Sequence, residues 1–186
     1  HRVDRRQRQM CIRDSSHSVA TKQRVPYNLQ TAISAERLEE IGDAFINVPE
    51  GFSVHPRVKP ILESRYRMTR EGKVDWAMAE LLSWGSLLQE GRDIRIAGED
   101  SCRGTFTQRH AIIVDRKNSN IYSPLRAIAQ THGGHFDIYN SSLSEFAGLG
   151  VEYGYSVAHT DALVCWEAHR QWCTNYCRRV RFLRGG

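Results

Sequence analysis

The segment from Asn140 to Ala168 constrains the fold of this chain more than any other part of the sequence. A strand-like run, Phe136–Tyr139, leads into a serine-rich turn, and an apolar helical stretch then ends in a second strand around Cys165. Ser142 and Glu145 have the spacing of a capping box, which predicts Ser142 as the N-cap and places Glu145 in the first helical turn. The order strand, turn, helix, strand is typical of an α/β fold with a parallel sheet.

Glu145 has two interpretations. Ligands of open α/β sheets bind in the crevice at the carboxyl ends of the strands, where a glutamate can hold a ring nitrogen of a cofactor. From the pattern alone, helix capping is the simpler role. A second acidic turn, Gly98–Asp100, follows the alternating strand Asp93–Ala97 and is expected at the same kind of edge.

Further helices and one more strand are indicated by local signals. Ser34–Ile46 and Pro60–Thr69 predict two helices in a helical connecting arm, residues 25–70, ahead of an α/β unit at 71–168. His110–Val114 predicts a strand. Another helix is expected between an N-cap at Asp75 and a C-cap at Gly91, with one apolar packing face formed by Ala77, Leu81, Trp84 and Leu88.

Three runs carry a resemblance to a known family: GDAFINVPEGFSVHPRVKPILESR (42–65), EGKVDWAMAELLSWGSLLQEGRDIRIAGEDSCRGTFTQRHA (71–111) and YNSSLSEFAGLGVEYGYSVAHTDALVCWEA (139–168). They resemble the pyrimidine-binding domain of thiamine diphosphate enzymes of the transketolase superfamily. More narrowly, they are similar to the decarboxylating component of 2-oxoglutarate dehydrogenase in its actinobacterial form. The resemblance covers about residues 25–168 and implies a truncated α/β pyrimidine-binding domain with a parallel sheet.

The resemblance also implies chemistry. Decarboxylation of a 2-oxo acid leaves negative charge on the former carbonyl carbon, and the thiazolium ring of thiamine diphosphate takes up that charge. In this superfamily a glutamate hydrogen-bonds the aminopyrimidine ring and promotes the imino form that removes the thiazolium proton. Glu145 matches that catalytic glutamate. Leu143 matches the cofactor-binding position whose backbone faces the amino group, and Glu99 matches the turn that approaches the cofactor.

By the same resemblance, the complete protein would be a cytoplasmic, homodimeric 2-oxoglutarate dehydrogenase or decarboxylase of the tricarboxylic acid cycle. It would require thiamine diphosphate and Mg²⁺, and would pass a succinyl group from 2-oxoglutarate to a lipoyl-bearing acyltransferase. The family's diphosphate and magnesium motif would precede residue 25, and its substrate histidines would follow Ala168. We therefore assign no metal ligands to this chain and expect it to be inactive alone.

Charge separates both ends of the chain from its middle. The net charge is +5, yet residues 1–24 contain seven Lys/Arg and two Asp, and residues 169–186 contain five Arg and no acid, so each end alone contributes +5. Residues 25–168 are acidic, with a net charge of −5. Read one nucleotide later, the C-terminal end can encode a run that the family places there. We expect 1–24 to be a non-native leader and 169–186 a frame-shifted tail.

The net positive charge does not indicate nucleic-acid binding, because the excess of Lys and Arg lies wholly in the two ends of the chain. No stretch approaches the roughly 20 apolar residues of a membrane span, so no membrane partner is expected. Cys173 and Cys177 lack a neighbouring His or second Cys pair, which argues against zinc. Cys102, beside a turn, and Cys165 are expected to be reduced structural thiols.

Three motifs that could suggest ligand binding or catalysis are interpreted as structural. The glycines of Gly148–Gly154 do not have the dinucleotide-binding spacing and indicate close helix packing. Arg109-His110 has no identifiable partner, which favours a surface or turn position. His132–His135 contains two histidines without a third ligand and is interpreted as a mobile loop.

Two alternative functions stay open at this point. One is another thiamine-dependent 2-oxo acid dehydrogenase of the same fold, acting on 2-oxoadipate or branched-chain substrates. The other is a non-catalytic acidic α/β module that binds partners. The capping-box context of Glu145 argues against the second alternative.

Overall fold

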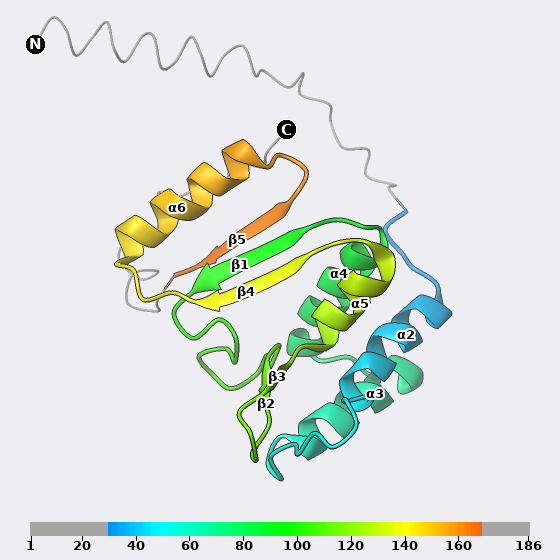
Figure 1. The fold of residues 1–186 in the computed structure, drawn as a ribbon. Coiled ribbons are helices and arrows are strands. Elements are labelled where there is room, and N and C mark those ends of the chain that lie inside the picture. Colours follow the sequence, from blue (N-terminus) through cyan, green and yellow to red (C-terminus); the bar gives the residue numbers. More distant parts are fainter. Residues whose placement is uncertain (1–29, 169–186) are drawn as a thin grey trace, which may run out of the picture. The chain divides into compact units, whose positions relative to one another are not determined.

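Three parallel strands form the central sheet of the computed structural model, which describes residues 30–168 (Figure 1). β1 (Ile94–Gly98) lies in the middle, between β4 (Phe136–Asn140) and β5 (Leu163–Glu167). Both pairs of strands are in register over their whole length, so the last residues of the three strands lie side by side: Gly98, Asn140 and Glu167. The α/β fold and the parallel sheet are confirmed.

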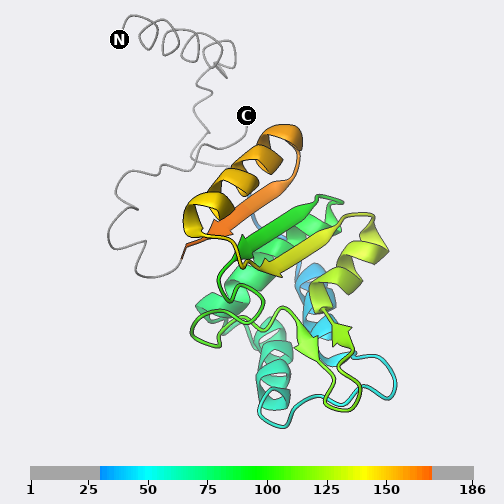
Figure 2. The ribbon, with the colours of Figure 1, turned by 60° about the vertical axis from the view of Figure 1, so that its left-hand side comes forward.

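Helices cover both faces of this sheet. α4 (Trp76–Gln89) and α5 (Pro124–His132) lie on one face, and α6 (Glu145–Ala158) lies on the other (Figures 1 and 2). The chain leaves β1 toward α5 and leaves the neighbouring β4 toward α6, so the two connections diverge to opposite faces. Such a divergence is the topological switch point at which open α/β sheets form a ligand crevice.

Two helices precede the sheet, as expected of the helical arm: α2 (Ala35–Ile46) and α3 (Lys59–Glu71). α2 packs against α3, α4 and α5, so its buried residues Ile41 and Phe45 belong to the core of the α/β unit. The same core takes residues from α4, α5 and the inner face of the sheet, including Leu81, Leu88, Leu125, Ile96 and Ile138. Among residues 30–168, no helix has the length and apolar character needed to cross a membrane.

The N-cap and most of the apolar face expected for α4 are confirmed, whereas its C-cap is Glu90 rather than Gly91. The Asp75 carboxylate accepts the backbone N–H of Met78 at 2.7 Å and caps the helix, while Gly91 follows the other end with φ +73°. Leu81, Trp84 and Leu88 of the expected apolar face are buried. Trp84 packs on the ring of Phe136, which confirms it as a packing residue.

The predicted capping box of α6 is wrong. Ser144, not Ser142, is the N-cap, and its hydroxyl accepts the N–H of Ala147 at 3.3 Å. Glu145 is then the first residue of the helix rather than the third. Residues 141–143 form a turn, in which the N–H of Leu143 donates to the Ser141 hydroxyl at 3.2 Å. The helix therefore begins after this turn, at Glu145. The position of Glu145 in the first turn is confirmed.

The region between β1 and α5 also differs from prediction. His110 has a φ of +46°, outside the strand region, so the expected strand His110–Val114 is reduced to the two residues of β2 (Ile113–Val114). β2 pairs antiparallel with β3 (Ile121–Tyr122). α5 was not predicted from the sequence, and because His132 is its last residue, the loop expected at His132–His135 begins only at Gly133. The expectations for residues 1–24 and 169–186 lie outside the described residues.

Candidate functional site

A pocket of about 260 Å³ lies at the carboxyl end of the sheet, at the switch point between β1 and β4. It brings together Glu99, Leu143 and Glu145, the three residues singled out from the sequence. They come from two segments separated by more than forty positions, the turn after β1 and the start of α6. The remaining lining residues are Gly98, Ser141, Ser142, Ser144, Gly148 and Trp166.

Glu145 presents a carboxylate to this pocket from the N-terminus of α6. Its side chain is half-buried, and one of its two carboxylate oxygens is buried completely. The N-terminus of α6 carries the positive end of the helix dipole, which is a favourable position for an acidic side chain. A buried carboxylate can accept a hydrogen bond from a heteroaromatic ring, or exchange a proton with it.

Leu143 lies in a turn that is fastened to the end of β1. The N–H of Ser141 donates to the carbonyl of Gly98 at 2.8 Å, and the Ser141 hydroxyl accepts the N–H of Leu143. The carbonyl of Leu143 is the one backbone group of this residue that could accept a hydrogen bond from a ligand amino group, since its N–H is a donor. The Leu143 side chain is 52% exposed and can cover a bound ring.

The two glycines of the pocket permit close approaches. A Cβ atom at Gly98 would clash with the carbonyl oxygen of Glu167, so β1 and β5 could not keep their present separation with any larger residue. A Cβ atom at Gly148 would lie 3.2 Å from the indole nitrogen of Trp166. The predicted role of the α6 glycines in close packing therefore holds for Gly148. An added Cβ atom at Gly150 or Gly154 would meet nothing within 4 Å, so these two glycines do not pack against residues 30–168.

Glu99 is exposed, but the turn that carries it is fixed by a hydrogen bond to β4 and by an ion pair within the turn. The N–H of Cys102 donates to the side-chain oxygen of Asn140, the last residue of β4, at 2.9 Å. Arg103 pairs with Asp100 at 2.5 Å within the turn. Cys102 is half-buried in this turn, and burial raises the pKa of its thiol, consistent with a reduced, structural cysteine.

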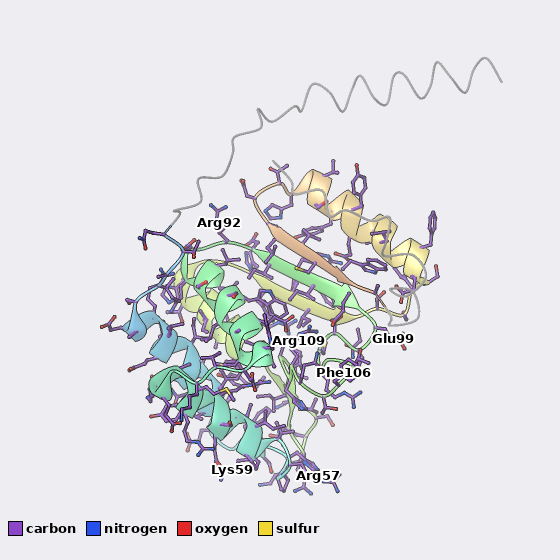
Figure 3. All side chains as sticks on the ribbon, turned by 180° about the vertical axis from the view of Figure 1, so that it is seen from behind. Arg57, Lys59, Arg92, Glu99, Phe106 and Arg109 are labelled. Carbon is purple, nitrogen blue, oxygen red and sulfur yellow. The ribbon has the colours of Figure 1, made fainter. Side chains whose placement is uncertain are left out.

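Of the surface or turn position predicted for Arg109-His110, the surface alternative is wrong, because both side chains are buried, although neither residue lies in a helix or strand. Arg109 forms ion pairs with Glu80 of α4 at 2.8 Å and with Glu167 of β5 at 2.6 Å. In Figure 3 it lies between α4 and the carboxyl end of the sheet. These partners come from distant parts of the sequence, which is why the local pattern did not reveal them. Burial lowers the pKa of His110.

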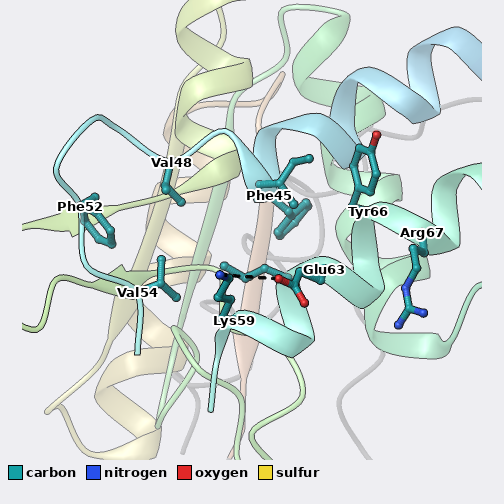
Figure 4. Close-up of a pocket in the computed structure, with 10 residues that line it drawn as sticks. Phe45, Val48, Phe52, Val54, Lys59, Glu63, Tyr66 and Arg67 are labelled. Carbon is teal, nitrogen blue, oxygen red and sulfur yellow. Dashed lines mark ion pairs between the residues drawn. The ribbon is translucent and has the colours of Figure 1, made fainter. Parts of the chain in front are cut away.

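A larger hollow, of about 930 Å³, lies between α2, α3 and the segment that joins them (Figure 4). Its walls are mostly apolar, from Phe45, Val48, Phe52 and Val54, and Lys59 pairs with Glu63 at its rim. Ligands of open α/β sheets bind at the switch point, and the smaller pocket lies there and contains Glu99, Leu143 and Glu145, so we take it as the candidate site.

No metal site is evident in the part of the chain that the structure describes. Residues 30–168 contain no group of three or more His, Cys, Asp or Glu side chains that could hold an ion. His132, considered with His135 as a weak metal motif, instead pairs with Glu40 at 2.8 Å. The metal-free assignment of this chain remains a prediction.

The pyrimidine-binding domain of transketolase matches residues 72–178, a span that contains the sheet, the pocket and all three candidate residues. The chain belongs to this family. The match continues past Ala168 into residues that the structure does not describe, so the expected frame shift stays a prediction.

Close relatives of this pyrimidine-binding domain are bacterial. The chain is 52% identical over 160 residues to the multifunctional 2-oxoglutarate metabolism enzyme of Mycobacterium sp. (strain JLS). It is 50% identical over 157 residues to the 2-oxoglutarate dehydrogenase E1/E2 component of Corynebacterium glutamicum. Each match covers 83% of this chain but only 13% of the relative. The chain thus spans about an eighth of the length of the curated relatives it matches.

Proposed function

We propose that this chain forms the pyrimidine-binding part of a thiamine diphosphate site in a 2-oxoglutarate dehydrogenase or decarboxylase. The observation that carries the proposal is the meeting of Glu99, Leu143 and Glu145 in one pocket at the switch point of the sheet. The names of the relatives support 2-oxoglutarate as the substrate of the complete protein. The product would be a succinyl group for a lipoyl-bearing acyltransferase, and the enzyme would be cytoplasmic.

When bound, thiamine diphosphate supplies the electron sink for decarboxylation of a 2-oxo acid. The residues of this chain hold and orient its aminopyrimidine ring. Glu145 would hydrogen-bond a ring nitrogen and share a proton with it, while the carbonyl of Leu143 would accept from the ring's amino group. The exposed Glu99 would approach the cofactor from the turn after β1.

The pocket fits a ring better than it fits a whole cofactor. Its volume of about 260 Å³ and its buried carboxylate oxygen suit an aminopyrimidine, whereas its remaining polar groups are mostly serine hydroxyls. A diphosphate is held best by cationic side chains or by a divalent metal ion. We therefore propose that another domain of the complete protein holds the diphosphate and Mg²⁺, and that this chain alone is inactive.

Exposed apolar residues on the outer face of α6 support the proposal that the site is completed by a second subunit in a homodimer. Phe146, Tyr153 and Val157 recur at helical spacing and are 60–80% exposed. Gly150, on the same side, leaves room for close approach of a second helix. A contiguous exposed apolar surface beside a ligand pocket is typical of a protein interface. The proposed occupant is the second subunit, which would cover this face and close the pocket.

Turnover by the complete protein tests the proposal. Full-length protein from the gene that contains this segment, supplied with thiamine diphosphate and Mg²⁺, should release CO₂ from 2-oxoglutarate, with a lower kcat/KM for 2-oxoadipate and branched-chain 2-oxo acids. A preference for one of the latter substrates would favour a different dehydrogenase of the same fold. Absence of both turnover and cofactor binding would favour a non-catalytic module and contradict the proposal.

A further inference from the structure

Arg109 uses its whole hydrogen-bonding capacity inside the protein. Nε and Nη2 donate to the Glu80 carboxylate at 2.8 and 3.0 Å. Nη1 and Nη2 donate to the Glu167 carboxylate at 2.6 and 3.2 Å, and Nη1 also donates to the carbonyl of Ser101 at 2.7 Å. These contacts employ all five N–H donors of a guanidinium group. Arg109 is only 4% exposed, and its guanidinium also lies over the Trp84 ring.

The three acceptors come from three separate elements. Glu80 belongs to α4, Glu167 is the last residue of β5, and Ser101 lies in the turn that carries Glu99. Burial disfavours a charged guanidinium, but the hydrogen bonds to Glu80 and Glu167 outweigh that penalty and raise the pKa of Arg109. The side chain is therefore a permanently charged connection between the helix layer and the carboxyl end of the sheet.

Two of these acceptors are direct neighbours of the candidate site. Ser101 is two residues from Glu99, and Glu167 follows Trp166, which lines the same pocket. A guanidinium that restrains Ser101 and Glu167 therefore restrains two walls of the pocket. The backbone of Arg109 is itself fixed, because its carbonyl accepts from the buried Arg65 of α3.

We infer that Arg109 is a positioning residue for the cofactor pocket: it holds the Glu99 turn and the Trp166 end of β5 at their mutual distance without touching the ligand. The identity of the ligand in this inference rests on the proposed function, whereas the positioning of the two pocket walls by Arg109 does not. Lysine cannot replace Arg109 here, because an ammonium group has three donors and lacks the planar fork that binds two carboxylates side by side.

Hydrogen exchange on the 186-residue chain tests the positioning role directly. The reporter amides are Cys102, bonded to Asn140, and Gly104, bonded to the Asp100 carbonyl at 2.7 Å. The reference amide is Leu163, bonded to Asp93 at the opposite end of the sheet. Arg109→Lys should speed exchange at the reporter amides at least ~10-fold relative to the reference amide, since it removes charge-assisted bonds from this end of the sheet.

Two control variants separate local positioning from general stability. Glu80→Gln weakens the connection to α4 but keeps the bonds from Arg109 to Ser101 and Glu167. Urea is added to this variant until its global stability equals that of Arg109→Lys. Under these conditions its reporter amides should stay protected. Arg70→Gln removes an Arg–carboxylate contact of 2.6 Å, to Asp43, outside the site and should change neither set of amides. Equal acceleration of reporter and reference amides in Arg109→Lys would overturn the inference.

A second measurement uses the complete enzyme. Arg109→Lys should raise the thiamine diphosphate concentration that gives half-maximal activity at least ~10-fold, with a smaller change in kcat, because it displaces walls of the cofactor pocket rather than the proton-transferring group. An unchanged cofactor requirement would contradict the positioning role. If the wild-type enzyme showed no dependence on thiamine diphosphate, the proposed function would fail, while the exchange result on the chain would still decide the role of Arg109.

Discussion

Glu152 of α6 receives two hydrogen bonds from the guanidinium of Arg95 in β1, at 2.7 and 3.0 Å. Glu152 is buried and lies two helical turns after Glu145, on the same side of α6. The guanidinium of Arg95 also lies over the rings of Tyr139 and Tyr155, so its position is fixed from both sides. The contact therefore determines how α6 sits on the sheet, and with it where Glu145 meets the pocket.

Glu152→Gln should destabilise the 186-residue chain by about 2–3 kcal/mol, since one partner of a buried charge pair is lost and Arg95 keeps its charge. Urea unfolding followed by circular dichroism measures this change. Asp43→Asn provides the matched control, because its pair with Arg70 is exposed and should contribute less than about 1 kcal/mol. Equal losses in the two variants would show that Glu152 does not fix α6 to the sheet.

Gly98→Ala should destabilise the chain by about 2 kcal/mol or more, because the added Cβ atom would meet the Glu167 carbonyl and force β1 and β5 apart. Gly150→Ala is the opposite case. Its Cβ atom meets nothing among the described residues, and alanine in place of an exposed helical glycine should stabilise the chain by about 0.5–1 kcal/mol. Thermal unfolding of both variants tests the pair. A neutral Gly98→Ala would contradict the tight contact between the strand ends.

The stability of the chain should fall in mild acid because of His110. Burial, followed by the charges of Arg65 and Arg103, lowers the pKa of His110 from its ordinary value of 6.5. The unfolded chain therefore binds this proton more readily, and stability that is complete above pH 6.5 is lost as the pH falls. His110→Asn, which tolerates the positive φ, should reduce the loss between pH 7.5 and 5.5 by up to about 1 kcal/mol. Identical pH dependence of the two proteins would refute this.

The 186-residue chain alone should bind thiamine diphosphate no more tightly than the millimolar range. The pocket offers contacts for the aminopyrimidine ring, whereas the metal-bridged diphosphate contacts that should supply most of the affinity are proposed to come from another domain. Calorimetric titration with the cofactor and Mg²⁺ measures this. A micromolar dissociation constant would sink the idea of a divided site.

Local signals predicted much of the sheet and the helix before it. The alternation in β1, the cap of α4 by Asp75 and the apolar run of β5 each depend on neighbouring residues, and all are found in the structure. The N-cap of α6 was misassigned because Ser142 and Ser144 both offer a capping hydroxyl. A tertiary contact decides between them, since Ser141 is bonded to Gly98 of β1 and delays the start of the helix.

The three candidate site residues could be chosen from the sequence because the resemblance supplied their roles, and the structure adds that they share one pocket. The support beneath that pocket could not be foreseen. Arg109 is 29 positions from Glu80 and 58 from Glu167, and no local periodicity connects residues at such separations. The lack of an identifiable partner in the sequence favoured a surface or turn position for Arg109, whereas its burial follows from two carboxylates that only folding brings together.

Turnover of 2-oxoglutarate by the complete enzyme carrying Glu145→Gln tests the catalytic role of this site most directly. Glutamine keeps the size and a hydrogen-bonding end, and its effect on the start of α6 should stay under about 1 kcal/mol. It cannot share a proton with the pyrimidine ring as a carboxylate does. We predict a loss of kcat of at least ~10²-fold, the usual scale for a positioned acid–base group, with little change in melting temperature. Near wild-type turnover by this variant would falsify the assignment of Glu145 as the catalytic glutamate.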